Sequence, residues 1–491
     1  MDSATRRLAA TAVATLVSAL LWTLGSGLTP VAAITWLAPL PVLLVASRTG
    51  PLLAFAAGAL AWLGGQLPLW TYYAGEIGMP VPLVLGLFVG TALVFGLAAW
   101  LFRSLVHKGL PVFAALSVPA VWVTLEYLFS LAMPHGAYWS LAYTQSDLPP
   151  VAQTASVTGV WGLTFLVLLV PAAIAATLAP GLSRRSRRTT ALVALVLVAV
   201  PVGYGVVRLA TAPEPRDTVA MAALSIDAPW PVMPYEAPEA PALVEAYRAA
   251  LPAVADAGAE IVVLPEKIFW VRETDAAEFL ATWSAMAVDA RVDLVVGAAL
   301  GQDGATYNVA IHLPADGGTP TAYRKHHMIP GLETDAPAGE PELTPGEEPA
   351  FVPGTPWGLV VCKDLDFPRL AADYRAAGAT VLLAPALDFG ADYDEWLHSR
   401  SAAMRGIEQG LSVVRAAEQG LATISDPYGR VSESGGTAIV VSVDTAGTTT
   451  VYGLLGDWFA WLAALVLAAC LFPILSRRPR PAVTLAASLP T

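Results

Sequence analysis

The sequence predicts a polytopic α-helical membrane domain joined to an extramembrane α/β domain, and three observations support this. First, the chain has 491 residues, of which 56% are hydrophobic and only 13% are charged, and its mean hydropathy is +0.59. A soluble protein of this length needs more charge to cover its surface, so part of the chain must face lipid. Second, long apolar runs recur at both ends of the chain. Third, between residues 217 and 450, short β-rich runs alternate with helical stretches, which is typical of an α/β fold.

Eight apolar runs predict the membrane part, and most approach the ~20 residues that a helix needs to cross a ~30 Å hydrocarbon core. They lie at 8–24, 30–47, 51–72, 82–104, 110–131, 157–179, 190–210 and 452–475. Further runs follow the first one at once and no clear cleavage site closes it, so we do not expect a signal peptide. We expect residues 1–210 to form a transmembrane domain of about seven helices, and 452–475 to form a final span before a cytoplasmic tail, 476–491.

Basic residues set the expected orientation. They precede the first run and follow the second, fourth, sixth and eighth: Arg6, Arg7, Arg48, Arg103, Lys108, Arg184, Arg185, Arg187, Arg188, Arg477, Arg478 and Arg480. The intervening loops 73–81 and 132–156 contain no Lys or Arg. The positive-inside rule makes the side that carries these residues cytoplasmic. We therefore expect both termini in the cytoplasm and residues 217–450 on the periplasmic face of a bacterial inner membrane.

Charge and cysteine usage exclude several classes of function. The net charge of −12 and the absence of a basic stripe argue against a nucleic-acid partner. The two cysteines, Cys362 and Cys470, are too far apart in sequence and setting for a disulfide framework or a CxxC zinc site. Cys470 lies in an apolar run, where a thiol behaves as a small hydrophobe. We expect neither a metal nor a cofactor.

The extramembrane segment predicts a layered α/β sandwich. The expected strands are 218–225, 260–265, 292–299, 306–313, 358–363, 379–384, 411–416, 420–425 and 437–443, and the expected helices include 237–257, 275–288 and 395–409. Residues 331–355 differ, because five prolines and several acidic residues leave no helix or strand period. We expect a long surface loop there, acting as a lid beside the site.

Two ionisable groups stand out at the ends of apolar runs. Glu266 follows the run Ile261–Leu264 and Pro265, and open α/β sheets place ligands at such strand ends. A surface carboxylate in a turn fits this context equally well. Lys325 lies in Tyr323–Pro330 together with two adjacent histidines, which would face opposite ways in a strand and so make a poor metal pair. A basic turn is the alternative there.

Cys362 is the third such group, at the end of the buried run Gly358–Val361. A thiolate is a strong nucleophile, but a free thiol with a pKa of about 8.5 needs help to ionise at neutral pH. A carboxylate can take its proton, and an ammonium can stabilise the charge that develops. Alone, this residue also fits an inert core cysteine. Together, Glu266, Lys325 and Cys362 supply a base, a cation and a nucleophile.

The order Glu266, Lys325, Cys362 resembles the nitrilase superfamily of carbon-nitrogen hydrolases. Later segments resemble its signatures too: Arg405–Glu408, Val413–Ala417 and Asp426–Arg430. This resemblance implies that residues 217–450 form a nitrilase-like catalytic domain with an α-β-β-α sandwich fold. Seven spans, such a domain and one more span resemble the bacterial apolipoprotein N-acyltransferases. Further similar segments are Tyr138–Gln145, Gly159–Gly162, Tyr307–Asn308, Lys325–Glu333 and Gly456–Trp458.

This second resemblance implies a ping-pong acyl transfer. Cys362 would take a fatty acyl chain from the sn-1 ester of a phospholipid as a thioester, with Glu266 as general base. Lys325 and the backbone N–H after the cysteine would stabilise the oxyanion. The N-terminal amine of a diacylglyceryl-cysteine lipoprotein or lipopeptide would then attack the thioester. The resemblance also implies supporting or substrate-binding residues: Glu333, Tyr307, Asn308, His327 and, on the substrate side, Trp230.

The sequence departs from the family at several positions. Lys363 stands where a tyrosine is expected, and Asp364 stands where a glutamate is expected; both flank the site as candidate supporting residues. Leu387–Gly390 replaces a longer motif, Glu418 replaces an asparagine, and the 331–355 loop is short and acidic. Two alternatives therefore remain: a membrane-anchored amidase or hydrolase in which water attacks the thioester, and a catalytically degenerate paralogue.

Overall fold

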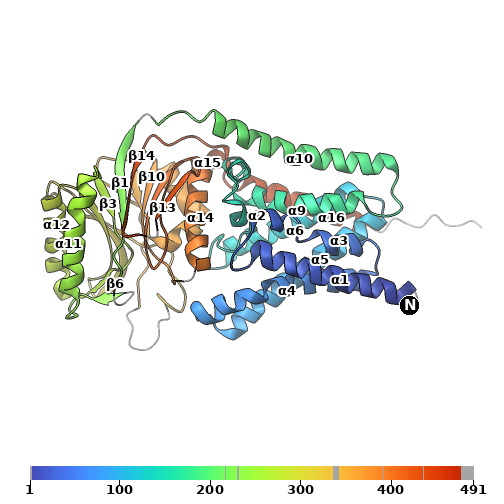
Figure 1. Ribbon diagram of the computed structural model, residues 1–491, viewed down its shortest axis with the longest axis horizontal. Helices are drawn as coiled ribbons and strands as arrows, with labels where there is room; N and C mark the ends of the chain where they lie inside the picture. The colour runs from blue at the N-terminus through green and yellow to red at the C-terminus, as the bar shows by residue number, and fades with distance from the viewer. Residues whose placement is uncertain are drawn as a thin grey trace, which may run out of the picture.

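The protein has two parts, a bundle of long helices and an α/β sandwich at one end of it (Figure 1). The computed structural model describes residues 3–215, 217–228, 232–334, 342–390, 392–434 and 436–476. The sandwich is inserted between the sixth long helix of the bundle and the last one. The fold class predicted from the sequence is confirmed.

Among the described residues, seven helices are long and apolar enough to cross a membrane by length and composition. They are α1 (Ser3–Ser26), α4 (Pro51–Gln66, continued by the turn Leu67–Leu69), α5 (Val81–His107), α6 (Pro111–Ala132), α9 (Val160–Thr177), α10 (Arg184–Ala210) and α16 (Trp458–Leu475). The predicted span at 30–47 forms two short helices instead, α2 (Ala32–Thr35) and α3 (Leu40–Ala46). Pro39 and Pro41 lie at the start of α3, and proline lacks the N–H that a continuous helix requires. A crossing by this segment stays a prediction.

Basic residues from distant segments meet at the end of the bundle away from the sandwich. Arg7, Arg48 and Arg103 line one shallow depression there. Arg48 donates to the carbonyl of Leu178 at 3.2 Å, and Arg187 donates to that of Thr177 at 2.8 Å. These clusters therefore share one end of the bundle, as the charge pattern predicted. The last predicted cluster lies beyond residue 476, outside the described residues, and the compartment that each end faces stays a prediction.

The α/β domain contains two sheets. The first has eight strands, in the order β14–β1–β3–β5–β4–β2 with β6 and β7 continuing from β5, and the second has six, in the order β13–β12–β11–β10–β9–β8. The first comprises β1 (Thr218–Leu224), β2 (Met233–Pro234), β3 (Ile261–Val263), β4 (Phe269–Val271), β5 (Asp293–Gln302), β6 (Ala305–Leu313), β7 (Thr321–Arg324) and β14 (Ala438–Asp444). The second comprises β8 (Ala350–Phe351), β9 (Trp357–Leu359), β10 (Val381–Leu387), β11 (Ser412–Glu418), β12 (Ala422–Ser425) and β13 (Val431–Ser434).

Side-chain alternation along the strands builds the layers. On the first sheet, Ala222, Val262 and Leu294 pack beneath α11 (Ala240–Asp256) and α12 (Ala276–Ala290). Their sequence neighbours Ala223, Val263 and Val295 pack with residues of the second sheet. Helices α13 (Pro368–Ala376) and α14 (Asp392–Gln409) pack against the second sheet, which gives the α-β-β-α order.

Helix α14 joins the sandwich to the bundle. Leu397, Met404 and Ile407 belong to the apolar core of the bundle, whereas Ala402 belongs to the core of the sandwich. Buried polar contacts reinforce this junction, since the N–H of Val160 donates to Glu408 Oε1 at 2.8 Å. The two parts are therefore packed against each other, and loops of the bundle reach the edge of the sandwich.

Candidate active site

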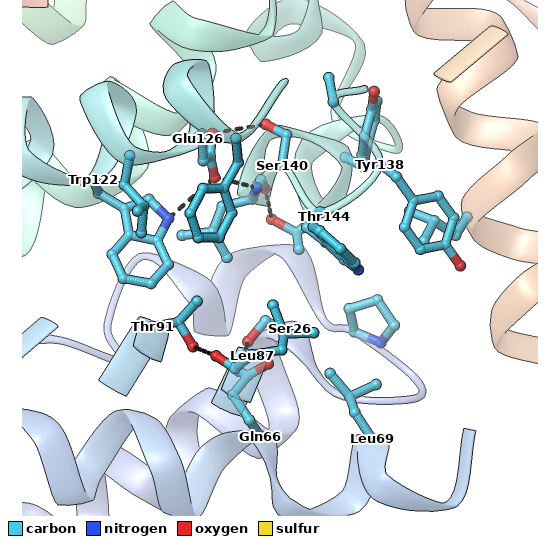
Figure 2. Close-up of a pocket in the computed structure, with 18 of the residues that line it drawn as sticks. Ser26, Gln66, Leu69, Leu87, Thr91, Trp122, Glu126, Tyr138, Ser140 and Thr144 are labelled. Atoms are coloured by element: carbon cyan, nitrogen blue, oxygen red, sulfur yellow. Dashed lines mark hydrogen bonds between the residues drawn. The ribbon is translucent and has the colours of Figure 1, made fainter. Parts of the chain in front are cut away.

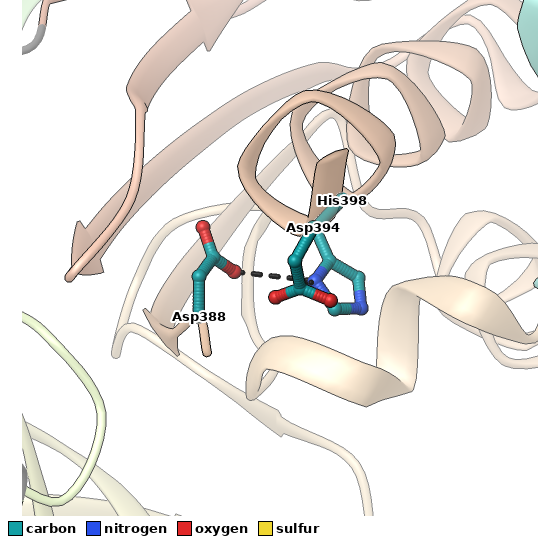
Figure 3. Close-up of side chains that lie close together, drawn as sticks. All are labelled: Asp388, Asp394 and His398. Atoms are coloured by element: carbon teal, nitrogen blue, oxygen red, sulfur yellow. Dashed lines mark hydrogen bonds and ion pairs between the residues drawn. The ribbon is translucent and has the colours of Figure 1, made fainter. Parts of the chain in front are cut away.

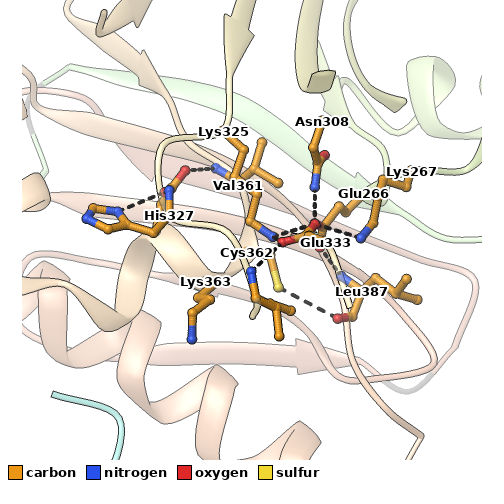
Figure 4. A network of polar contacts seen from close by, with 12 residues as sticks. Glu266, Lys267, Asn308, Lys325, His327, Glu333, Val361, Cys362, Lys363 and Leu387 are labelled. Carbon is orange, nitrogen blue, oxygen red and sulfur yellow. Dashed lines mark hydrogen bonds and ion pairs between the residues drawn. The ribbon is translucent and has the colours of Figure 1, made fainter. Parts of the chain in front are cut away.

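Five side chains meet in one buried polar network at an edge of the first sheet (Figure 4). Lys325 Nζ donates to Glu266 Oε1 at 2.9 Å and to Glu333 Oε2 at 2.8 Å. Asn308 Nδ2 bridges the two carboxylates, at 2.6 Å from Glu266 and 2.7 Å from Glu333. Lys267 adds an ion pair of 2.8 Å to Glu333. Four predicted site residues thus lie together, and Lys267, which directly follows Glu266 in sequence, joins them.

Charge pairing determines protonation in this network. Burial alone would raise the pKa values of Glu266 and Glu333, but the ammonium groups of Lys325 and Lys267 hold both below their ordinary values. Burial alone would lower the pKa of Lys325, but the two carboxylates raise it well above its ordinary value. Two anions and two cations therefore balance, which is what buried charges require.

The strands place these groups. Glu266 follows β3 by three residues, and Lys325 follows β7 directly, with its N–H donating to the carbonyl of Asn308 at 2.7 Å. Gly297 of β5 makes room for the carboxylate segment, because a Cβ there would lie 2.6 Å from Glu266 Cα. Tyr307 points to the opposite face of β6 from Asn308, with the Arg324 guanidinium 3.9 Å from its ring centre. Tyr307 therefore stays outside the network.

Cys362 opens the short 3-10 helix η5 (Cys362–Asp366) in a strained conformation, with φ of 45°. Its Sγ lies 3.6 Å from the carbonyl of Leu387, and the N–H of Leu387 donates to Glu266 Oε2 at 3.1 Å. One residue at the end of β10 therefore contacts both the thiol and the carboxylate. Burial and the charge of Glu266 raise the pKa of the thiol well above its ordinary value, against the opposing effect of Lys325. The resting thiol is therefore protonated and requires a base.

Asp364 braces the turn that follows the cysteine. Its carboxylate accepts hydrogen bonds from Tyr323 Oη at 2.8 Å and from the N–H groups of Val361 and His327 at 3.0 and 2.9 Å. The His327 ring stacks on Phe367 with 3.5 Å between ring centres. Asp364 therefore ties the residue before Cys362 to the segment that carries Tyr323 and His327.

A cavity opens beside Cys362, and the helix bundle supplies part of its wall. Its lining comprises Tyr73, Ile77, Met79, His135, Tyr138 and Trp139 of the bundle, and Ile329, Cys362, Lys363, Asp366, Leu387, Phe389 and His398 of the sandwich. Lys363 Nζ lies 3.0 Å from Nδ1 of His135. Burial and the nearby ammonium lower the pKa of His135 to about 4, so this ring is neutral and accepts the hydrogen bond.

Two predicted features fall partly or wholly outside the described residues. Trp230 lies outside the described residues, and so do residues 335–341 of the predicted lid. The rest of the lid segment returns along the site, where the N–H of Leu343 donates to the carbonyl of Glu333 and that of Gly346 donates to the carbonyl of Lys325, both at 2.8 Å. The loop also contains the short strand β8, which its sequence did not predict. Its main chain is therefore tied to two network residues.

A second cavity lies in the bundle beside the first (Figure 2). The two cavities share Tyr73, Tyr138 and Trp139, and apolar and aromatic side chains dominate the lining of the second. Glu126 lies in its wall, where its carboxylate accepts from Thr164 and from the N–H of Leu141, both at 2.8 Å. Its hydrogen bonds make Glu126 a structural anchor of the loop after α6.

Asp388, Asp394 and His398 form a separate cluster whose ligand-type atoms lie within 4.8 Å of one another (Figure 3). His398 Nδ1 lies 3.2 Å from an oxygen of each aspartate, and Arg415 pairs with Asp388. Burial would lower the pKa of His398, but the aspartates, Asp394 foremost, raise it well above its ordinary value. Two cations already balance the two carboxylates, so the cluster is an ion-pair network that links α14 to the strands β10 and β11.

Glu333→Gln is expected to lower the free energy of unfolding at neutral pH, and this loss should become smaller as the pH falls. Because the folded pKa of Glu333 is depressed, its stabilising contribution is present above the unfolded glutamate pKa of about 4.3 and is lost as pH falls toward the folded value. Denaturant unfolding of detergent-solubilised protein over a pH series measures this, with the exposed Glu347→Gln as control. A difference from wild type that stays constant with pH would contradict the pairing.

Comparison with known proteins agrees with both resemblances seen in the sequence. Residues 218–448 match the family model described as carbon-nitrogen hydrolase, and residues 18–173 match that described as apolipoprotein N-acyltransferase N-terminal domain. Proteins named apolipoprotein N-acyltransferase are similar over most of the chain. That of Geobacter metallireducens is 27% identical over 481 residues, covering 89% of each chain. That of Bradyrhizobium diazoefficiens is 28% identical over 428 residues, covering 79% of this chain and 76% of that one.

Solved structures of the nitrilase superfamily resemble the sandwich. An amidase from Nesterenkonia sp. is 19% identical, with a TM-score of 0.38, over 47% of this chain and 92% of its own. Nit3 of Saccharomyces cerevisiae is 18% identical, also with a TM-score of 0.38, over 48% of this chain and 93% of its own. The matches to relatives, with the seven apolar helices, identify a bacterial membrane protein and confirm the predicted resemblance.

Proposed function

We propose that this chain, in which a carbon-nitrogen hydrolase domain follows an apolipoprotein N-acyltransferase N-terminal domain, is a lipoprotein N-acyltransferase with Cys362 as its nucleophile. It moves a fatty acyl chain from a phospholipid to the N-terminal amine of a diacylglyceryl-cysteine lipoprotein. The observation that carries this proposal is the buried thiol beside the Glu266–Lys325 pair, at a cavity whose wall comes partly from the helix bundle.

The first half-reaction forms the thioester. Glu266 takes the thiol proton as the sulfur attacks the ester carbonyl, and then returns that proton to the leaving lysophospholipid. Lys325 and the backbone N–H of Lys363 stabilise the oxyanion. The cavity beside Cys362 and the largely apolar cavity that adjoins it in the bundle supply space for the acyl chain.

The second half-reaction transfers the chain to the amine and restores the thiol. Both substrates are lipid-anchored, so a catalytic domain packed on the bundle meets them at a high effective concentration. The sandwich lies at the end of the bundle opposite the basic clusters, which supports the periplasmic placement of the site with both termini in the cytoplasm.

Mass spectrometry of the protein after exposure to phospholipid vesicles tests the proposal. We expect an added acyl mass on the peptide that contains Cys362, and its discharge when a diacylated lipopeptide is supplied. Cys470, buried in α16, is the matched internal control and should stay unmodified. Absence of any adduct would refute the thioester. Release of free fatty acid without N-acylated peptide would show a hydrolase instead.

A further inference from the structure

Asp366 is a buried carboxylate whose side chain makes no hydrogen bond and no ion pair within 4.0 Å among the described residues. It lies at the end of η5, four residues after Cys362, and lines the same cavity as the nucleophile. Its side chain is 2% exposed, and its Oδ1 has no hydrogen-bond partner among the described residues. Its carbonyl accepts the N–H of Ala137 at 2.8 Å, which holds this turn against a loop of the bundle. A buried carboxylate without a partner is costly, so its retention calls for a ligand.

Three cations, His398, Lys363 and Arg405, act electrostatically on Asp366, but each makes its closest polar contact with another group. His398 contacts Asp388 and Asp394, each at 3.2 Å. Arg405 pairs with Glu408 at 3.0 Å, and Lys363 donates to His135 at 3.0 Å. Among the described residues, no ion pair within 4.0 Å involves the Asp366 carboxylate. The cavity beside the nucleophile therefore contains a buried acceptor oxygen that is open to a ligand donating hydrogen bonds.

We propose that Asp366 binds the protonated N-terminal amine of the acyl acceptor and removes its first proton. This rests on the proposed function, because it concerns the second half-reaction at Cys362. An ammonium offers the charge and the hydrogen-bond donors that the carboxylate lacks. Both residues line one cavity, so an amine held by Asp366 is next to the thioester. Burial raises the pKa of Asp366 against the opposing charges of His398, Lys363 and Arg405, which makes it a better proton acceptor than an exposed aspartate.

The ammonium gives one proton to Asp366 and becomes a neutral amine. The amine nitrogen attacks the thioester carbon, an N–C bond forms and the C–S bond breaks. The second proton leaves the nitrogen through Glu266 and reaches the departing sulfur, which restores the thiol. The products are the amide, the Cys362 thiol and a protonated Asp366, which then releases its proton to water.

Separate assays of the two half-reactions on the full-length protein test this role. In Asp366→Asn, we expect the rate of adduct formation from phospholipid vesicles to match wild type. The kcat/KM for transfer to a diacylated lipopeptide should fall by about 10–100-fold, the range for losing a hydrogen bond to a charged group. Asp366→Glu should recover part of this loss. The exposed Asp373→Asn on α13 is the control and should behave as wild type.

Hydroxylamine, which is uncharged at neutral pH, separates amine binding from a structural effect. It should discharge the acyl adduct of Asp366→Asn as fast as that of wild type, because it brings no proton for Asp366 to remove. Normal lipopeptide transfer by Asp366→Asn would overturn the proposal, and so would slowed adduct formation or slowed discharge by hydroxylamine. Failure of the proposed function is distinct, because wild type itself would then form no adduct.

Discussion

Replacing Cys362 with serine is expected to abolish acyl transfer, with a loss of about 10⁴-fold or more, while the protein inserts and folds normally. Serine is close to cysteine in size and can donate the same hydrogen bond to the carbonyl of Leu387, so packing is preserved. A hydroxyl is much harder to deprotonate than a thiol, and Glu266 is too weak a base to do so efficiently. Transfer to a lipopeptide and thermal unfolding, measured on the same preparation, check both halves of this expectation.

Cys470→Ser is the matched control for that variant. Cys470 is buried in α16, with its Sγ 3.4 Å from the carbonyl of Phe113. The substitution therefore makes the same change of sulfur to oxygen, but far from the site. It should leave transfer close to wild type. N-acylation that persists in Cys362→Ser would rule out the assignment of Cys362 as nucleophile.

Lys325→Met is expected to abolish transfer and also to destabilise the fold by about 3–5 kcal/mol, the usual cost of removing one partner from a buried ion pair. Lys325 is fully buried and contacts both Glu266 and Glu333, so its loss leaves two carboxylates against the single ammonium of Lys267. Equilibrium unfolding in detergent measures the stability, and adduct formation measures the chemistry.

Lys267→Met provides the comparison. Lys267 pairs closely with Glu333 but lies 3.7 Å from Glu266, so its removal should cost stability and leave more of the chemistry than Lys325→Met. Equal loss of adduct formation in the two variants would show that total charge, rather than the placement of Lys325, determines the activity. A Lys325→Met protein as stable as wild type would contradict the ion-pair network itself.

Much of the fold followed from sequence periodicity. All nine predicted strands and the three predicted sandwich helices are present. Strands β2, β4, β7, β8 and β13 have two to four residues each and were missed; β3 and β9 are equally short, but they belong to the apolar runs Ile261–Leu264 and Gly358–Val361. Helix α13 was also missed, although Pro368 at its start is typical of a first helical turn.

The candidate site was predictable where a residue follows a strand and less so where a loop folds back. Glu266 and Cys362 each follow an apolar run, and Lys325 follows the short strand β7 in a cluster of ionisable residues, so the sequence marks them. Tyr307 and Asn308 were both predicted as supporting residues. Only Asn308 faces the carboxylates, because successive side chains of a strand point to opposite faces of the sheet. The place of Asp366 could not be predicted, because part of its surroundings comes from the bundle, far away in sequence.

The division of the cavity wall between bundle and sandwich has a consequence for how the enzyme is made. Tyr73, His135 and Trp139 are synthesised long before Cys362, and domains generally fold in the order in which the ribosome releases them. The helices that precede the sandwich in the chain therefore form a surface on which it docks, with α14 as the docking face, and α16 joins the bundle afterwards. Until that docking occurs, the nascent chain carries Cys362 without the part of the cavity wall that the bundle supplies.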